Sequence, residues 1–351
     1  MPGSVYSVGH QAPIPESRSQ KASKLTTDNW QLTLEILDLR HFSSADLRML
    51  LEQEAEVWAR LLSWDYAASS EMVLRYIDSK ILPGYAAVDR GRVLGYAFFV
   101  YEGSKGVIGD LFSDTGDGSH EARQRAQEIE TKLLIHSIET LQQSPGVHRI
   151  ETQLLLHESG SVVRPFTDAG FRCHPRLFMR MDIGQPVESP IVLNKEIEIR
   201  PWSENDYQPT ASLITAAYRG HVDSEINDQY RTVNGSMRFL HNIVRFPGCG
   251  TFNPESSFTA YNRALRTTVG VILCSKIRHD VGHVTQVCVL PEYRSHGIGD
   301  ALMHRSAEQL RTRGFDALTL TVTQANAGAV HLYERLGFTT KHVFDAFVWE
   351  G

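Results

Sequence analysis

The stretch that decides the fold combines a short apolar run, a turn and a pair of glycines, and it reads Val287-Cys288-Val289-Leu290-Pro291-Glu292-Tyr293-Arg294-Ser295-His296-Gly297-Ile298-Gly299. Apolar residues then recur at helical spacing from Ile298 to Leu310, which predicts a helix that ends near Gly314. Apolar residues alternate with threonines in 318–323, which predicts a strand. Asn326 is a candidate N-cap for a second helix. The stretch therefore predicts a strand, a glycine loop, a helix, a strand and a helix.

The glycine loop has the features of an anion-binding site. Backbone N–H groups in a tight turn at a helix N-terminus can hold an anion. Gly297 and Gly299 allow close approach of the backbone, and Arg294 can add a positive charge beside them. The spacing Arg-x-x-Gly-x-Gly is neither the Rossmann fingerprint nor the phosphate loop that ends in Gly-Lys-Ser/Thr. A pyrophosphate is the expected ligand.

Two motifs together carry a resemblance to a known family. Arg294-x-x-Gly297-x-Gly299 is followed by Asn326-x-x-Ala329-x-x-Leu332-Tyr333-x-x-x-Gly337-Phe338. In this order the pair resembles the GNAT superfamily of acyl-CoA-dependent N-acetyltransferases. The resemblance is sharpest over 287–338 and extends more loosely over 197–349. It implies acetyl-CoA as the acyl donor.

The resemblance also implies roles for single residues. The backbone of the strand before the loop would pair with the pantetheine arm of the donor, Asn326 would help to orient the donor, and Tyr333 would protonate the leaving thiolate. The strand residues are Val287, Cys288 and Val289, and the loop and first helical residues that would hold the pyrophosphate are Arg294, Ser295, His296, Gly297, Ile298, Gly299 and Asp300. Asp300 departs from the family pattern, because a carboxylate would repel a phosphate, and we expect it to point away from the ligand.

The sequence leaves alternatives open at several of these positions. His283 lies near the place where relatives carry a general base, and an imidazole suits proton transfer near neutral pH, but a structural histidine is the alternative. Tyr333 could be a packed helix tyrosine, and Asn326 could be only an N-cap. Cys288, between two valines, is expected to be packing rather than a nucleophile.

The first half of the chain repeats the order of the second half. Residues 163–171 echo residues 331–338, with Phe166 at the place of Tyr333 and Ser159 at the place of Asn326. The stretch at the loop position, 113–120, contains two aspartates and lacks the arginine–glycine spacing. We therefore expect a domain duplication whose first copy is degenerate for donor binding.

The expected fold class is α/β (α+β), with two tandem GNAT-like domains, each a twisted, mostly antiparallel sheet flanked by helices. Residues 1–30 are predicted to be a disordered tail, because they are rich in Ser, Pro, Gln and Lys. A degenerate domain is expected over 31–184, a linker with two prolines over 185–195, and a catalytic domain over 196–351. The tandem architecture is similar to that of the mycothiol synthases, although no residue requires their substrate.

Composition sets outer limits on function. The chain has 351 residues, of which 42% are hydrophobic and 22% charged, as in soluble globular proteins. The net charge of −6 argues against nucleic-acid binding through overall charge, and no apolar run is long enough to cross a bilayer. The four cysteines form no CxxC pattern, so neither a disulfide framework nor a metal site is predicted. We expect a cytoplasmic monomer or homodimer.

The function that these features predict is transfer of an acetyl group from acetyl-CoA to a small-molecule primary amine, by direct attack in the C-terminal domain. A non-catalytic CoA-binding or regulatory protein on the same scaffold is the rival class. Transfer of a longer acyl group is a second alternative. The sequence does not identify the acceptor amine.

Overall fold

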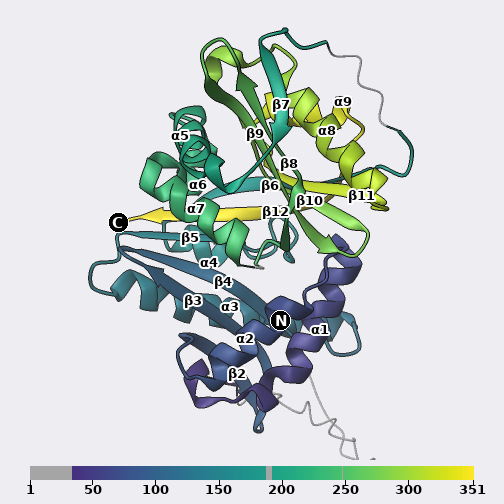
Figure 1. Cartoon of the computed structure of the whole chain (residues 1–351). Helices are drawn as coiled ribbons and strands as arrows, with labels where there is room; N and C mark the ends of the chain where they lie inside the picture. Colours follow the sequence, from purple (N-terminus) through teal and green to yellow (C-terminus); the bar gives the residue numbers. More distant parts are fainter. Residues whose placement is uncertain (1–33, 187–191, 247) are drawn as a thin grey trace, which may run out of the picture. The chain divides into compact units, whose positions relative to one another are not determined.

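The computed structural model describes residues 34–186, 192–246 and 248–351, and their strands form one twelve-stranded sheet. The strand order is β1-β2-β3-β4-β5-β12-β6-β11-β10-β9-β8-β7 (Figure 1). Nine of the eleven strand pairings are antiparallel, and the two parallel ones are β4 with β5 and β10 with β11. The structure is thus mixed α/β and mostly antiparallel, as predicted.

The first half of the chain supplies six strands and four helices of the described part. They are β1 (Glu35–Asp38), α1 (Ser44–Leu62), α2 (Ala67–Asp78), β2 (Gly84–Asp89), β3 (Arg92–Glu102), β4 (Lys105–Ser113), α3 (His120–Gln143), β5 (Arg149–Gln153), α4 (Val163–Asp168) and β6 (Arg172–Asp182).

The second half supplies the other six strands and five helices. They are β7 (Ile197–Pro201), α5 (Tyr207–Ala217), α6 (Asp223–Ile226), α7 (Val233–Arg245), β8 (Thr251–Asn262), β9 (Thr267–Arg278), β10 (Val281–Val289), α8 (Ile298–Thr312), β11 (Ala317–Thr323), α9 (Ala327–Arg335) and β12 (Thr339–Glu350). Short 3₁₀ turns join several of these elements.

The two halves exchange their last strands. Strand β12 of the second half lies between β5 and β6 of the first half, and β6 lies between β12 and β11. On either side of this exchange the order is the same, because β1 to β5 and β7 to β11 each end in one parallel pair. This symmetry supports the duplication, although the expected boundaries at 184 and 196 remain a prediction. The expected tail, and part of the expected linker, lie outside the described residues.

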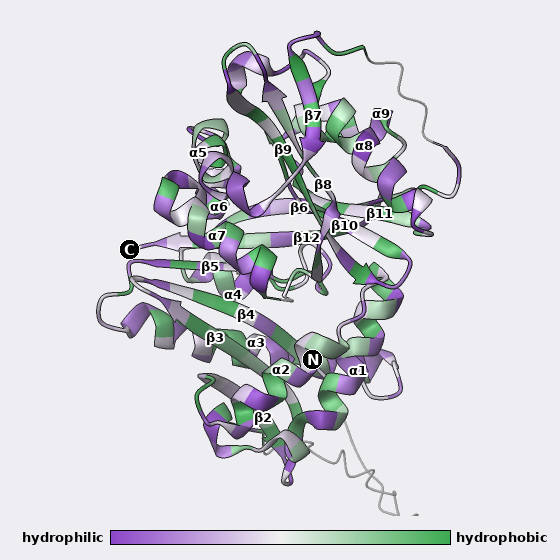
Figure 2. Cartoon of the chain, in the orientation of Figure 1, coloured by the Kyte–Doolittle hydropathy of each residue, from purple (hydrophilic) through white to green (hydrophobic). Residues whose placement is uncertain are grey.

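Helices cover both faces of the sheet in each half. Along β9, Ile272 and Cys274 pack with α8, whereas Val271 and Leu273 pack with α5 and α7 on the opposite face. This alternation follows from the two-residue period of a strand, and burial on both faces makes the strand apolar throughout. Figure 2 shows the same pattern as hydrophobic colour along the central strands.

Local signals explain where several elements begin. Helix α1 begins after a capping box that Ser43 and Asp46 form. Helix α3 begins at His120, where Ser119 accepts a hydrogen bond from the Ala122 N–H and caps the helix. The N-cap at Asn326 is confirmed in the same way by its bond from the Ala329 N–H.

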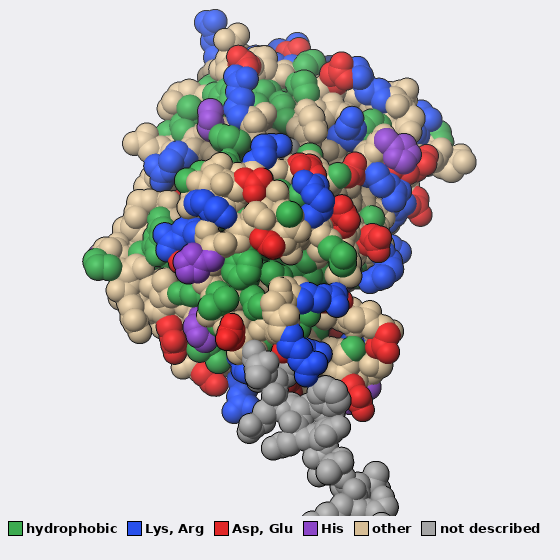
Figure 3. All heavy atoms as spheres, turned by 90° about the horizontal axis from the view of Figure 1, so that it is seen from below, with side chains coloured by type: hydrophobic (Ala, Val, Ile, Leu, Met, Phe, Trp, Pro, Cys, Tyr) green, Lys and Arg blue, Asp and Glu red, His purple; other side chains and the backbone are tan. Residues whose placement is uncertain are grey.

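The surface seen in Figure 3 carries charges of both signs side by side. Lys and Arg side chains are interspersed with Asp and Glu, and apolar side chains lie between them, some in small groups. A face with charges of both signs does not create the extended positive potential that attracts nucleic acids. No helix within the described ranges is long and apolar enough to cross a membrane.

Candidate functional site

A cavity of about 1010 Å³ lies where β10 and β11 diverge. The two strands pair in parallel only from Val281 to Val284 with Ala317 to Leu320. Beyond these residues they separate, so the backbone from Gln286 to Val289 faces the cavity without a strand partner on that side. An opening between the two strands is therefore present, which leaves the strand before the glycine loop free on that side.

The glycine loop closes one end of this cavity. Ser295 and Gly297 both have left-handed backbone, with φ of 63° and 76°, and Gly297 is the N-cap of α8. A β-carbon on Gly299 would lie 3.6 Å from Leu332 Cδ2, so this glycine leaves an open surface on the first turn of the helix. The turn presents helix N–H groups to the cavity, which is the geometry of an anion cradle.

Arg294 lines the cavity and connects the glycine loop to α5 and β10 through hydrogen bonds. Its guanidinium donates to the carbonyl oxygens of Ala217, at 2.6 Å, and Val289, at 3.3 Å. The His296 ring, in contrast, lies outside the residues that line the cavity, and its Nδ1 donates to the Arg294 carbonyl oxygen at 2.7 Å. Of the seven residues predicted to hold a pyrophosphate, six therefore line the cavity.

Asp300 is among the residues that line the cavity while being only 6% exposed, and its expected orientation away from a ligand stays a prediction. Its two carboxylate oxygens lie 3.1 Å from His304 Nε2 and 3.1 Å from the Arg335 guanidinium. The Arg335 charge neutralises the carboxylate, which reduces its repulsion of a nearby anion.

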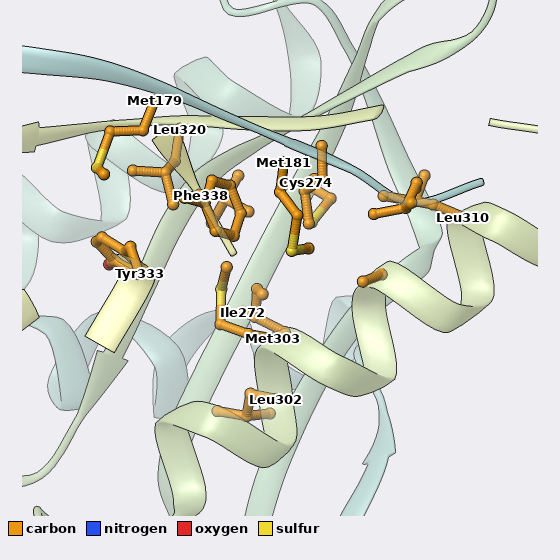
Figure 4. Packing of buried hydrophobic residues seen from close by; sticks show 14 of the residues in the cluster. Met179, Met181, Ile272, Cys274, Leu302, Met303, Leu310, Leu320, Tyr333 and Phe338 are labelled. Atoms are coloured by element: carbon orange, nitrogen blue, oxygen red, sulfur yellow. The ribbon is translucent and has the colours of Figure 1, made fainter. Parts of the chain in front are cut away.

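Tyr333 extends from α9 into the same cavity. Figure 4 shows its ring beside the apolar cluster that contains Leu320 and Phe338. Among the described residues nothing forms a hydrogen bond to its hydroxyl. Burial, and then the negative charge of Asp223, raise the pKa of Tyr333 well above its usual value. Asn326, the N-cap of α9, also lines the cavity, so capping and ligand contact are compatible.

The strand residues Val287, Cys288 and Val289 line the cavity wall. The Val287 carbonyl oxygen accepts a 3.4 Å hydrogen bond from the Tyr218 hydroxyl. Cys288 is 9% exposed, and burial raises the pKa of its thiol to about 12. A thiol that stays protonated is a poor nucleophile, which agrees with the expectation that Cys288 serves packing.

His283 lies in the cavity wall and is held by polar and aromatic neighbours. The Thr319 hydroxyl donates to the Gly282 carbonyl oxygen at 3.1 Å, so His283 Nδ1, 2.9 Å from that hydroxyl, must be the donor. This leaves Nε2 as the acceptor nitrogen. The ring packs against Trp64 and Phe178. Burial, aided by the Arg176 charge, lowers the pKa of His283 to about 3.

Sequence reasoning missed a second group of residues in the cavity. Tyr218, His221 and Asp223 come from the segment between β7 and α7, with Tyr230, and none belongs to a recognisable motif. The Tyr218 and Tyr230 rings stack at 4.5 Å, and His221 Nδ1 lies 3.4 Å from an Asp223 oxygen. A carboxylate and stacked aromatic rings together form a surface that suits an amine.

The first half also reaches this cavity. Gln153 on β5 and Arg176 on β6 line it, because the strand exchange places β6 directly beside β11 and β5 on the far side of β12. Arg176 lies directly opposite Thr323 of β11 in the sheet register. No periodicity or spacing in the sequence marks Arg176, whose position follows only from the long-range strand pairing.

The counterparts of the site in the first half are occupied by the chain's own side chains. Asp114 and Asp117 accept hydrogen bonds from the N–H groups of Gly116 and Ser119 in the equivalent loop. Phe166, at the place of Tyr333, is fully buried and stacks on Phe347 of β12 at 4.0 Å. The loop amides that could hold a phosphate are thus bonded to carboxylates instead.

A buried pair of carboxyl groups lies beside the divergent end of β4. Glu54 accepts hydrogen bonds from Tyr96 and Trp58, and Asp110 accepts one from Tyr66. Burial raises the pKa of Glu54 well above its usual value, and the nearby Asp110 charge raises it further. Burial also raises the pKa of Asp110. These side chains occupy the region that corresponds to the cavity of the second half.

Comparison with known proteins agrees with this geometry. The profile of the Acetyltransferase (GNAT) family matches residues 227–338. Mycothiol acetyltransferase from Thermobispora bispora is 49% identical over 59 residues, which are 17% of this chain and 20% of that protein. The chain thus matches about a fifth of the length of this curated relative.

Solved structures match over nearly the whole described chain. A GCN5-related N-acetyltransferase from Sphaerobacter thermophilus has a TM-score of 0.62 and 20% identity, with 90% of this chain and 95% of that chain covered. A tandem GNAT protein from the clavulanic acid biosynthesis pathway has a TM-score of 0.56 and 13% identity, with 90% and 98% covered. The chain has the fold of a tandem GNAT protein, and residues 227–338 of its second half match the Acetyltransferase (GNAT) family.

Proposed function

We propose that the second half of the chain transfers an acetyl group from acetyl-CoA to a primary amine by direct attack. The observation that carries the proposal is the cavity between β10 and β11, with the glycine loop at one end and Tyr333 in its wall. Acetyl-CoA would supply an activated acyl thioester. The unpaired strand backbone and the helix N-terminus fit its two polar parts, an amide-containing arm and a pyrophosphate.

Strand backbone, helix N–H groups and one arginine would hold the acetyl-CoA. The backbone of Gln286 to Val289, which has no strand partner on the cavity side, can form hydrogen bonds with amide groups as a neighbouring strand would. The N–H groups of 297–299, with Arg294 beside them, would hold the pyrophosphate. Arg294 must then exchange one of its backbone carbonyl partners for the phosphate, which offers it a charge-assisted bond instead of a neutral one.

Two proton movements accompany the transfer. The amine nitrogen forms a bond to the acyl carbon, the carbon–sulfur bond breaks, and the sulfur takes a proton from the Tyr333 hydroxyl. The raised pKa of Tyr333 means that this hydroxyl is protonated at neutral pH and also that it is a weaker acid than a free tyrosine. The amine proton must leave to an acceptor, and His283 Nε2 is the candidate that the geometry offers.

The low pKa of His283 limits what it can contribute. An imidazole with a pKa of about 3 stays neutral and accepts a hydrogen bond at all working pH values, but it holds a full proton only briefly. His283 would therefore orient the amine and pass its proton on to solvent rather than store it. Its role remains a proposal.

Thiol release tests the proposal directly. We expect the purified full-length chain to release free thiol from acetyl-CoA when supplied with primary amines, and not with matched alcohols. Mass spectrometry of the products should show an acetylated amine. Tight binding of acetyl-CoA without thiol release from any amine would instead support a non-catalytic CoA-binding protein. Comparing acetyl-CoA with longer acyl-CoA donors would test the acyl length.

A further inference from the structure

The acceptor end of the cavity contains two opposite charges that are not paired with each other. Asp223 on α6 accepts a hydrogen bond from the Thr323 hydroxyl, and Arg176 on β6 lies opposite Thr323 in the antiparallel register. Residues opposite each other point to the same face of a sheet with α-carbons about 5 Å apart. Both charged groups therefore lie at the same end of the cavity, yet no ion pair joins them among the described residues.

Arg176 has unused hydrogen-bonding capacity. One terminal nitrogen donates to the Gln153 side-chain oxygen at 2.7 Å, a neutral partner. Its Nε is buried and has no partner in the part of the chain that the structure describes. No carboxylate lies within ion-pair distance of Arg176 in the same described residues. A partly buried guanidinium without an anion is energetically costly, unless a ligand supplies one.

The nearby carboxylate of Asp345 does not neutralise Arg176. Asp345 on β12 lies opposite Pro175 of β6, the residue before Arg176. Its two oxygens accept hydrogen bonds from the Ser159 hydroxyl and the Gly160 N–H, both at 2.8 Å. Those bonds hold the loop before α4, and they direct the carboxylate away from the guanidinium.

The other side of this end suits a cation. Asp223 supplies the negative charge, and the stacked rings of Tyr218 and Tyr230 line the cavity beside it. Asp223 also lies close enough to Tyr333 for its charge to raise the pKa of that hydroxyl. An ammonium group beside Asp223 would thus be near the group proposed to protonate the leaving thiolate.

We propose that the acceptor is an amine that also carries an anionic group, with the ammonium at Asp223 and the anion at Arg176. This inference rests on the proposed acetyl transfer. The anion can be a carboxylate, as in an amino acid, or a phosphate, because a guanidinium fork binds both in two-pronged fashion. Arg176 and Gln153 belong to the first half, so the degenerate copy supplies the specificity of the catalytic one.

Matched pairs of amines test the inference. One arm compares amino acids with their amides, and the other compares phosphoethanolamine with ethanolamine, each in the thiol-release assay with the full-length chain. We expect kcat/KM to be at least about tenfold higher for the anionic member of one arm, since a charge-assisted bond to the partly buried Arg176 is lost in the neutral member. The arm that shows the preference identifies the anion.

Substitutions of Arg176 test whether this side chain causes the preference for anionic amines. Arg176→Gln should remove the difference between the two members, through KM rather than kcat, and Arg176→Lys should restore part of it. Arg180→Gln is the matched control, because Arg180 lies on the same strand, pairs with Asp182 at 3.1 Å and does not line the cavity. Calorimetric binding of the same amines in the presence of CoA provides a second readout.

The outcomes separate the two proposals. Thiol release without any preference for anionic amines would overturn the anion subsite and leave acetyl transfer intact. Calorimetric binding of anionic amines that depends on Arg176, without turnover, would support the subsite and refute acetyl transfer. Equal binding of both members of every pair to the wild-type chain would refute the subsite whatever the turnover.

Discussion

At the residue scale, burial decides which side chains of the cavity can exchange protons. Tyr333, Cys288 and His283 are all nearly covered by the fold, and burial favours the neutral form of each. The neutral form differs among these groups. The tyrosine and the thiol are neutral when protonated, so they keep their protons, whereas the imidazole is neutral when it carries only one, so it does not take up a second.

Tyr333→Phe tests the acid at this scale. The change removes a proton donor and almost no volume, so acetyl-CoA affinity should remain near that of the wild type. Turnover should fall by about a hundredfold or more, the usual effect of losing general acid assistance. Steady-state thiol release and calorimetry would measure the two quantities. Near-normal turnover would mean that water protonates the thiolate and that Tyr333 serves packing.

Glu54→Gln tests the buried carboxyl pair of the first half. Because the folded pKa of Glu54 is raised, the folded state keeps a proton that the unfolded state loses above about pH 4.3. Stability is therefore full below that pH and falls as pH rises, by up to about 1.4 kcal/mol per pH unit for one retained proton. Glutamine cannot ionise, so the variant should lose less stability between pH 5 and 8.

Denaturant unfolding at several pH values measures this difference. Glu56→Gln, on the exposed side of the same helix, is the control and should follow the wild-type curve. Parallel curves for the wild type and Glu54→Gln would show that Glu54 is ionised in the folded state.

At the element scale, the sequence predicted what local signals determine. The glycine loop, α8, β11 and α9 form a continuous segment whose turns and caps involve neighbouring residues, and all four were predicted near their observed positions. The acceptor end was not predicted, because Asp223 and Arg176 meet only through strand pairing and helix packing. The ion pair of Asp300 was not predicted for a related reason, since its partner Arg335 comes from a different helix.

Gly299 offers a clean test of the loop. Gly297 has a φ of 76°, so a side chain there would strain the fold as well as fill the site. Gly299 lacks that constraint, and an added β-carbon would make only ordinary contacts with Leu332 and Val289. Gly299→Ala should therefore leave the melting temperature almost unchanged.

Gly299→Glu places a negative charge in the same position. A carboxylate in the first turn suits the helix dipole, so the variant should fold, but it should repel a pyrophosphate. We expect acetyl-CoA affinity to fall at least tenfold by calorimetry, with a melting temperature close to that of Gly299→Ala. Unchanged affinity in the folded variant would refute the loop assignment.

At the scale of the whole molecule, the two copies contribute differently. The second copy contains the cavity, and the first copy supplies some of the side chains that line it. The first copy satisfies its loop amides with Asp114 and Asp117 and fills the place of Tyr333 with a packed phenylalanine. It retains the strands that carry Gln153 and Arg176 into the second copy's cavity.

Calorimetry with acetyl-CoA should accordingly give one binding site per chain. The first copy would need to break several internal hydrogen bonds before its loop could accept a phosphate, whereas the second copy's loop amides face an open cavity. A Gly299→Glu chain should show no remaining high-affinity site. Two equivalent sites in the wild type would contradict the view that the first copy is degenerate.

The exchange of β6 and β12 also has a consequence for how the protein is made. Strand β5 leaves the ribosome before any of the second half, yet its neighbour β12 is the last of the described strands in chain order. Until β12 is made, β5 presents an unpaired edge and β6 has at most one of its two sheet partners, β11. A chain that ends before β12 therefore leaves the sheet of both halves incomplete, so the two halves complete their folding together.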